Sequence, residues 1–295
     1  MLLLDKPAGI TSTRALARAK RLLGSLKGGH TGTLDPFATG LLPLVFGEAT
    51  KFSRFLLDSH KGYEATLRLG EETPTGDTES DVAARRAVEA DDAAIDAVLA
   101  SFLGAQTQVP PMHSAVRVDG RRLYDYARAG ETVERPVRDV EVSELARLSR
   151  RGDDLTVRVA CSKGTYVRTL AQDIGTRLGC GAHLVALRRT VVGPFSLAQS
   201  LDFDTLEREG RDFARSRLLP PEALVSALPR FDADPATAER FAHGQVVDAP
   251  EGPGAEVAVF AAGGRFLGVA SRSAPGRLAP LRLLAPPAAK LPDFA

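Results

Sequence analysis

The sequence predicts an α+β protein with a strand-dominated core, helices packed on that core, and a small β domain after it. Three observations support this fold class. Hydrophobic residues alternate at period two over 137–148 and 155–161, around Gly152-Asp153-Asp154, which is typical of a β-hairpin. Apolar residues at helical spacing follow over 167–178. After residue 220 the composition shifts toward Ala, Pro and Gly, which indicates a second domain.

The first 40 residues predict a strand, a helix and a loop. Leu2-Leu3-Leu4 is a short apolar run, as in a buried strand. Thr11-Ser12 precede an amphipathic pattern that stops at Gly24, so we expect a capped helix between them. The stretch 27–40 is rich in Gly, Thr and Pro and has neither helical nor strand periodicity, which predicts a loop.

The middle of the chain supplies further elements of the core. Residues 63–69 alternate like a strand, and the acidic run 71–81 that follows predicts a loop. The apolar spacing over 95–103 predicts a helix that ends at Gly104, and a last core strand is expected over 184–192.

Residues 110–136 form a polar stretch flanked by prolines, which suggests an insertion that projects from the core. Four arginines in it surround Tyr124 and Tyr126, and this mixture suits contact with an RNA backbone and stacking on bases. An ordinary surface excursion is the alternative.

We divide the chain into two domains. The first covers residues 1–229 and includes the insertion. The second is a small β domain at 230–295, where residues 257–260 and 265–270 predict a second hairpin.

Composition restricts the class of protein. No stretch approaches the roughly 18 consecutive apolar residues of a membrane span, and Met1 to Asp5 lack the basic start of a signal peptide, so we expect a soluble, cytoplasmic protein. Cys161 and Cys180 are too few for a disulfide framework. Together with His183 they match no standard zinc spacing, so no metal site is predicted.

The formal net charge of +1 conceals an uneven distribution. Residues 1–30 carry six basic side chains against Asp5 alone, and residues 158–189 carry six against Asp173. Residues 71–99 instead hold nine acids against two arginines. The two basic regions could follow a phosphate backbone, or they could be ordinary solvated faces.

The segment Gly29-His30-Thr31-Gly32-Thr33-Leu34-Asp35-Pro36 is the densest candidate for chemistry. The proline restricts Asp35 to extended geometry, and a rigid turn of this kind can fix a carboxylate for attack or for proton transfer. Asp35 could instead only bond its own backbone in an Asx-type turn. His30 and Asp35 together could also suggest a metal hydrolase, but two ligands are too few for a confident site.

A second candidate runs from Cys161 to Arg168 through a glycine turn into the start of a helix. Helix N-termini favour anions, and Arg168 could pair with a carboxylate delivered from elsewhere in the chain and keep it ionised. A purely structural salt bridge is the alternative.

These segments and several others resemble the TruB family of tRNA pseudouridine synthases, in the family's order and over most of the first 200 residues. The segments that carry the resemblance are Leu2-Leu3-Leu4-Asp5-Lys6-Pro7, Gly29 to Gly32, Leu34-Asp35-Pro36, Ala38 to Pro43, Gly47 to Lys51, Lys61-Gly62-Tyr63, Pro110-Pro111-Met112, Leu123-Tyr124, Cys161 to Arg168, and Gly179 to Leu184.

The resemblance implies a pseudouridine-synthase core, with a mixed and mainly antiparallel sheet flanked by helices, and a C-terminal domain similar to a PUA domain. It implies that Asp35 is the catalytic aspartate, that Arg168 pairs with it, and that Tyr63 stacks on the target base. The expected substrate-binding residues that shape the pocket, beside Tyr63, are His30, Tyr166 and Leu187.

The implied reaction isomerises uridine 55 in the T loop of tRNA. The uracil is detached from its ribose at N1 and rejoined through C5, without a cofactor or a metal. The insertion would clamp the RNA, and the C-terminal domain would contact the acceptor side. We expect a monomer without an obligatory protein partner. The chain departs from the family's pattern at His113, where tyrosine is usual, and in its weakly matching C-terminal region.

Three other functions compete with this interpretation. A guide-RNA-dependent relative would need partner proteins, but the uninterrupted bacterial-type motif order and the lack of basic tails favour a stand-alone enzyme. An RNA-binding protein with a disused pocket would not need Asp35, Tyr63 and Arg168 together. A metal-dependent hydrolase built on His30 and Asp35 would lose activity with a chelator.

Overall fold

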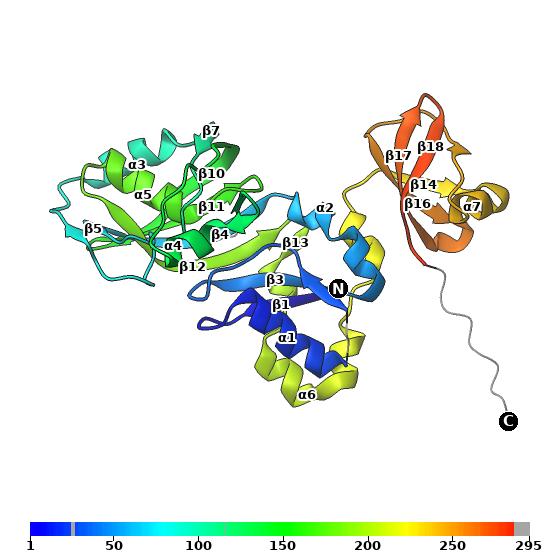
Figure 1. Ribbon diagram of the computed structural model, residues 1–295, viewed down its shortest axis with the longest axis horizontal. Coiled ribbons are helices and arrows are strands. Elements are labelled where there is room, and N and C mark those ends of the chain that lie inside the picture. Colours follow the sequence, from blue (N-terminus) through cyan, green and yellow to red (C-terminus); the bar gives the residue numbers. More distant parts are fainter. Residues whose placement is uncertain (25–26, 115, 286–295) are drawn as a thin grey trace.

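The computed structural model describes residues 1–24, 27–114 and 116–285. Figure 1 shows a large body built on one sheet, with a smaller C-terminal body beside it. None of the helices in the described ranges is long and apolar enough to cross a membrane. The last ten residues of the predicted domain 230–295 lie outside the described residues.

A nine-stranded sheet forms the large body and confirms the predicted mixed, mainly antiparallel core. Strands β3 and β12 pair in parallel, and the other pairs in this sheet are antiparallel. In spatial order the main path is β1 (Leu2–Lys6), β3 (Thr39–Phe46), β12 (Ala182–Val192), β4 (Lys61–Leu69), β11 (Asp154–Cys161), β10 (Arg138–Arg151) and β7 (Gly104–Gln108). Two short strands join it, β2 (Gly28–His30) beside β3 and β13 (Phe195–Ser196) beside β12.

Helices pack on the sheet at both ends (Figure 1). Helix α1 (Ser12–Leu23) contacts α6 (Phe203–Ser216), while α5 (Val167–Arg177) packs on β12 and α3 (Asp92–Ala100) packs on β10. The predicted caps of α1 are confirmed, because the Thr11 side chain accepts from the backbone N–H of Arg14 and Gly24 is left-handed. Helix α6 was not predicted, and it breaks its helical geometry at Gly210.

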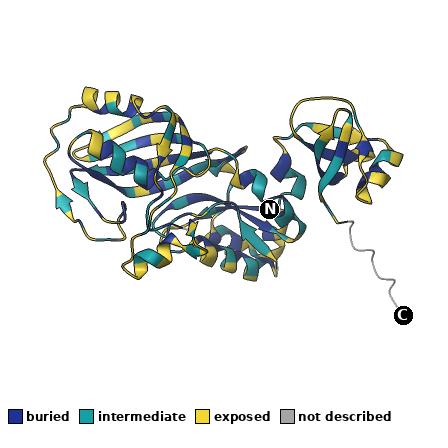
Figure 2. Cartoon of the chain, turned by 45° about the horizontal axis from the view of Figure 1, so that its top comes forward, coloured by how far each residue is buried: buried dark blue, intermediate teal, exposed yellow. Residues whose placement is uncertain are grey.

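Alternation along β1 and β3 divides their side chains between two cores. Leu4 and Leu42 join the main core with the buried faces of α1 and α5. Leu3 and Leu41 point to the opposite face and join a second core, to which the C-terminal body contributes. Figure 2 shows that buried residues gather along the sheet, while exposed ones lie on the outer faces of the helices.

The C-terminal body is a five-stranded sheet with one helix, as the predicted small β domain requires. Its order is β14 (Arg230–Ala233), β16 (Glu256–Ala261), β17 (Phe266–Ala274), β18 (Arg277–Leu283) and β15 (Val247–Asp248), and α7 (Pro235–Ala242) packs on it. The rings of Phe52 and Phe266 lie 5.2 Å apart across the boundary between the bodies. Arg54 and Glu256 form an ion pair there, so the two bodies share a core and a polar contact.

Short elements complete the fold around the sheet. The insertion contains a hairpin of β8 (Arg117–Val118) and β9 (Arg121–Arg122) followed by α4 (Leu123–Arg128). The remaining elements are β5 (Glu71–Glu72) paired with β6 (Ala84–Arg85), α2 (Arg54–Leu57), and the 3-10 turns η1 (Gly47–Phe52), η2 (Leu197–Gln199), η3 (Pro221–Val225) and η4 (Ala262–Gly264).

Two loop predictions were partly wrong. Within 27–40, β2 pairs with β3, and β3 itself begins at Thr39. Strand β3 is buried on both faces, so its sequence lacks the alternation of polar and apolar residues that would have revealed a strand. The acidic run 71–81 is not a simple solvated loop either, because it begins in strand β5 and folds Thr73, Thr75 and Asp77 into the interior.

Gly40 allows β3 and β12 to approach each other. Its φ is +102°, and a Cβ built on it would lie 2.3 Å from the carbonyl oxygen of Arg189. Gly104 has a similar φ of +94° with nothing within 4 Å of such a Cβ. An alanine at Gly104 would therefore meet only the backbone penalty of a positive φ, whereas an alanine at Gly40 would meet that penalty and a steric clash as well.

We predict that Gly104→Ala lowers the free energy of unfolding by about 1–2 kcal/mol, the usual cost of left-handed geometry. Gly40→Ala should cost about 4 kcal/mol or more, because the clash with β12 is added. Denaturant unfolding of both variants measures the difference. Equal losses would mean that the β3–β12 approach tolerates a methyl group.

Candidate active site

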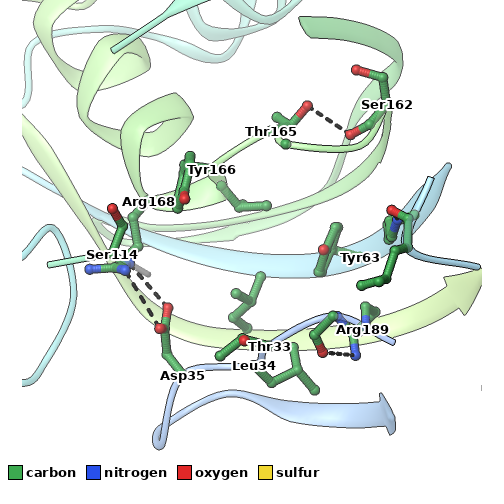
Figure 3. A pocket seen from close by; sticks show the side chains of 16 residues that line it. Thr33, Leu34, Asp35, Tyr63, Ser114, Ser162, Thr165, Tyr166, Arg168 and Arg189 are labelled. Atoms are coloured by element: carbon green, nitrogen blue, oxygen red, sulfur yellow. Dashed lines mark hydrogen bonds and ion pairs between the residues drawn. The ribbon is translucent and has the colours of Figure 1, made fainter. Parts of the chain in front are cut away.

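A cavity of about 260 Å³ opens beside β4, β12 and the start of α5. Five of the six predicted site residues line it, namely Asp35, Tyr63, Tyr166, Arg168 and Leu187. Figure 3 shows Asp35 and Arg168 together at one end and Tyr63 with Arg189 at the other. Its size is near the lower end of small-ligand sites, so it suits a single nucleotide unit.

Buried polar groups fix the loop that carries Asp35. The Ser12 hydroxyl donates to the carbonyl of Leu34 at 3.0 Å and accepts from its N–H at 2.8 Å. The ammonium of Lys6 donates to the carbonyls of Pro7 and Ile10 at 2.8 Å and to that of Pro36 at 3.4 Å, and burial lowers its pKa to about 8. The turn is thus bound to β1 and α1 on both sides of Asp35.

Asp35 and Arg168 form the predicted ion pair. The Nε atom lies 3.1 Å from Oδ2, and one terminal nitrogen lies 3.5 Å from Oδ1, so both carboxylate oxygens face the guanidinium (Figure 3). The Arg168 side chain is only 6% exposed, whereas that of Asp35 is 32% exposed. The Asp35 carboxylate is therefore partly accessible from the cavity, while its partner Arg168 is buried inside the protein.

Arg168 is held by three further groups. It donates to the carbonyl of Thr75 at 3.1 Å and to that of His113 at 2.7 Å. The carboxylate of Asp77 lies 3.5 Å from the same nitrogen that contacts Thr75. One buried arginine thus connects the Asp35 loop, the acidic run and the insertion.

The pKa of Asp35 reflects opposing influences. Burial raises the pKa of this carboxyl above its usual range, Arg168 opposes that rise, and Asp77 adds to it. Arg168 stabilises the ionised form, as expected from the sequence, but the effect of burial is larger and the net shift is upward.

Tyr63 and Arg189 form the other end of the cavity (Figure 3). The fully buried Arg189 donates to the carbonyl of Leu41 at 2.8 Å and to that of Gly32 at 3.2 Å. It also interacts with the Tyr63 phenol, whose pKa is raised by burial. Arg189 therefore joins the Asp35 loop to the strand that bears Tyr63.

Tyr166, the residue before α5, and Leu187 on β12 border the same space. Gln108 on β7 holds the backbone of Tyr166, because its side chain accepts from the N–H at 2.9 Å and donates to the carbonyl at 3.4 Å. His30 is not among the residues that line the cavity. It lies on β2 opposite Leu44, with a buried Nδ1 that has no hydrogen-bond partner among the described residues.

Sequence reasoning missed several cavity residues and partners. Asp77 stood in a run taken for a loop, although Thr73-Pro74-Thr75-Gly76-Asp77 is a turn pattern that could have marked it. Lys61 lines the cavity and donates to the carbonyls of Leu56, Leu57 and Ser59, and burial lowers its pKa to about 8. Nothing in the sequence pattern indicated Arg189 or Ser114.

The basic side chains of region 158–189 do not form one exposed face. Arg168 and Arg189 are buried, and Arg188 pairs with Asp5 at 2.6 Å. In the other basic region, Arg18 pairs with Glu207 and lies over the ring of Phe203. Among the described residues, no group of three or more His, Cys, Asp and Glu side chains could hold a metal ion.

Comparison with known proteins identifies the family. The sequence model described as "TruB family pseudouridylate synthase (N terminal domain)" matches residues 20–167. The chain belongs to the TruB family. Models described as "tRNA pseudouridylate synthase B C-terminal domain" and "Pseudouridine synthase II TruB, C-terminal" match residues 168–226 and 229–284. The C-terminal region, weak in recognisable motifs, therefore also has TruB counterparts.

Relatives and solved structures agree with this assignment. The tRNA pseudouridine synthase B of Burkholderia mallei (strain NCTC 10247) is 54% identical over 291 residues, which cover 96% of each chain. That of Aromatoleum aromaticum is 50% identical, covering 96% of this chain and 92% of the relative. A chain of a crystal structure titled as a Cbf5-Nop10-Gar1 complex shares 26% identity with a TM-score of 0.76, covering 97% of this chain and 84% of that one.

The geometry around Arg168 predicts how Asp77 affects Asp35. Because the negative charge of Asp77 raises the pKa of Asp35, Asp77→Asn should lower that pKa. NMR titration of the Asp35 carboxyl carbon measures the shift. Asp81→Asn removes an exposed carboxylate from the same loop and should leave the value unchanged. An unchanged or higher value in Asp77→Asn would show that the two carboxylates do not interact.

Proposed function

We propose that this chain isomerises uridine 55 in the T loop of tRNA to pseudouridine, with Asp35 as the essential carboxylate. The observation that carries the proposal is the Asp35–Arg168 pair, which faces a nucleotide-sized cavity in a chain of the TruB family. Membership of that family, whose curated relatives are named tRNA pseudouridine synthase B, supplies the reaction class.

The cavity suits a nucleotide that has left its stack. A base in a folded T loop must be extruded before a side chain can reach its glycosidic bond. Tyr63 then offers a π-face worth roughly 1–3 kcal/mol per stacked base. Tyr166 and Leu187 border the same space and limit where the uracil can lie. His30, outside the lining, would act on the nucleotide only through the loop that it precedes.

Asp35 lies where it can act on the bond between base and sugar. In the proposed reaction the bond between N1 and the sugar breaks, the uracil turns within the cavity, and the sugar carbon bonds to C5. C5 then loses its proton and N1 gains one, so the product is an isomer of the substrate. The isomerisation involves no net oxidation and takes no group from another molecule, so the proposal includes no cofactor or metal. Arg168 holds both carboxylate oxygens and fixes the direction in which Asp35 faces.

A stand-alone monomer in the cytoplasm is part of the proposal. The 54% identity to a tRNA pseudouridine synthase B extends over 96% of both chains, whereas the match to the chain from the Cbf5-Nop10-Gar1 complex is 26% identical. The higher likeness favours an enzyme that recognises its own substrate over one that acts within an assembly.

The insertion and the C-terminal domain complete the proposed RNA-binding surface. Tyr124 is 45% exposed, and Arg128 lies over its ring, so this pair can meet a base or the backbone. His113 replaces the usual tyrosine but contacts Arg168 through its backbone carbonyl, which any residue provides. We assign the PUA-like role of contacting the acceptor side of the tRNA to residues 230–295.

We predict that Asp35→Asn abolishes pseudouridine formation while tRNA binding stays within about tenfold, or roughly 1.4 kcal/mol. Purified parent and variant are incubated with unmodified tRNA transcript in the presence of a chelator. Pseudouridine is mapped by chemical modification and primer extension, and binding is measured separately. Asp81→Asn serves as the control because it removes an exposed carboxylate outside the cavity lining.

Modification at the T-loop uridine by the parent alone, with chelator present, supports the stand-alone enzyme. An active Asp35→Asn variant would refute the assigned role of Asp35. A parent that binds tRNA but modifies nothing would favour the partner-dependent relative or a binding protein, and loss of parental activity with chelator would favour a metal-dependent reaction.

A further inference from the structure

The start of the insertion is fixed against the cavity. The His113 carbonyl accepts from Arg168 at 2.7 Å. On the next residue, the backbone N–H of Ser114 donates to Met112 and its carbonyl accepts from Tyr124 at 3.0 Å. Leu123 is wholly buried, and its backbone N–H donates to the carbonyl of Val116 at 2.8 Å. Ser114 therefore has a set position, although it belongs to a projecting insertion.

The Ser114 side chain lacks a partner in a place where it needs one. The residue is 6% exposed and lines the cavity, yet its buried hydroxyl has no hydrogen-bond partner among the described residues. The hydroxyls of Ser162 and Thr165, which line the same cavity, both have backbone partners. An unpaired buried hydroxyl costs about 1–3 kcal/mol, so its retention indicates a partner that arrives with the substrate.

Position within the cavity indicates which part of the substrate this is. Figure 3 shows Ser114 beside Arg168 at the Asp35 end, away from Tyr63. If the uracil stacks on Tyr63 and Asp35 acts at the bond between base and sugar, groups at the Asp35 end face the sugar side of the nucleotide. The serine hydroxyl can donate to a ribose or phosphate oxygen there, or accept from a ribose hydroxyl.

We propose that the Ser114 hydroxyl forms a hydrogen bond with the ribose–phosphate unit of the target nucleotide, making it a substrate-binding residue contributed by the insertion. This inference rests on the proposed function. Because the His113 carbonyl contacts Arg168, the cavity gains its Ser114 contact only when the insertion is docked on the arginine that supports Asp35.

The test compares Ser114→Ala and Ser114→Thr with Ser216→Ala, a control in α6 whose hydroxyl bonds only its own helix at the carbonyl of Phe213. Three quantities are measured: the Tm of the free protein, the Kd for T-stem-loop RNA with uridine or an abasic ribose at the target position, and the single-turnover rate on tRNA transcript. The abasic RNA keeps the sugar and phosphate but removes the base.

For Ser114→Ala we expect an unchanged or slightly higher Tm, because an unpaired hydroxyl is removed. Its Kd should rise about tenfold, as for the loss of one hydrogen bond near 1.4 kcal/mol, equally for uridine and abasic RNA. The single-turnover rate at subsaturating tRNA should fall by a similar factor. Ser114→Thr, which keeps the hydroxyl, should stay within about threefold of the parent, and Ser216→Ala should match the parent.

Several results would overturn the inference. A lower Tm in Ser114→Ala would indicate a structural hydroxyl, an unchanged Kd would mean no contact, and a loss confined to uridine RNA would mean a contact with the base. Weak binding by Ser114→Thr at parental Tm would exclude the hydroxyl as the group responsible. Failure of the proposed function is visible separately, because the parent would then make no pseudouridine.

Discussion

The buried guanidinium of Arg168 is the constraint on which the rest of the site depends. A charge removed from water must be compensated, and this one meets Asp35 and Asp77 together with the carbonyls of Thr75 and His113. These partners come from three separate parts of the chain. Compensating one charge therefore fixes the Asp35 loop, the acidic run and the insertion relative to each other.

Arg189 plays a parallel part at the opposite end of the cavity. It is fully buried, donates to the carbonyl of Gly32 in the Asp35 loop and to that of Leu41 on β3, and interacts with the phenol of Tyr63. Two buried arginines thus set the ends of the space in which a base would lie. Lys6 and Ser12 also bond backbone carbonyls of the Asp35 loop, so this loop needs little rearrangement when the substrate binds.

How much could be predicted depended on whether the signal was local. Helix α1 was predictable because Thr11 and Gly24 mark its ends. The β10–β11 hairpin was predictable because hydrophobic residues alternate along both strands. Strand β3 was missed because burial on both faces removes alternation. The Asp35–Arg168 pair came from family resemblance, since the two residues are 133 positions apart. Asp77 stands in a local turn pattern that could have marked it, whereas Ser114 matters only through contacts made by the folded chain, so no local pattern distinguished it.

In the proposed function, the cavity between Arg168 and Tyr63 receives the extruded target uridine. The most direct measurement is a crystal structure of the Asp35→Asn variant bound to an unmodified T-stem-loop. We expect a flipped uridine with its base on Tyr63 and its glycosidic bond beside residue 35. A uridine that remains stacked in its loop, or that lies outside this cavity, would contradict it.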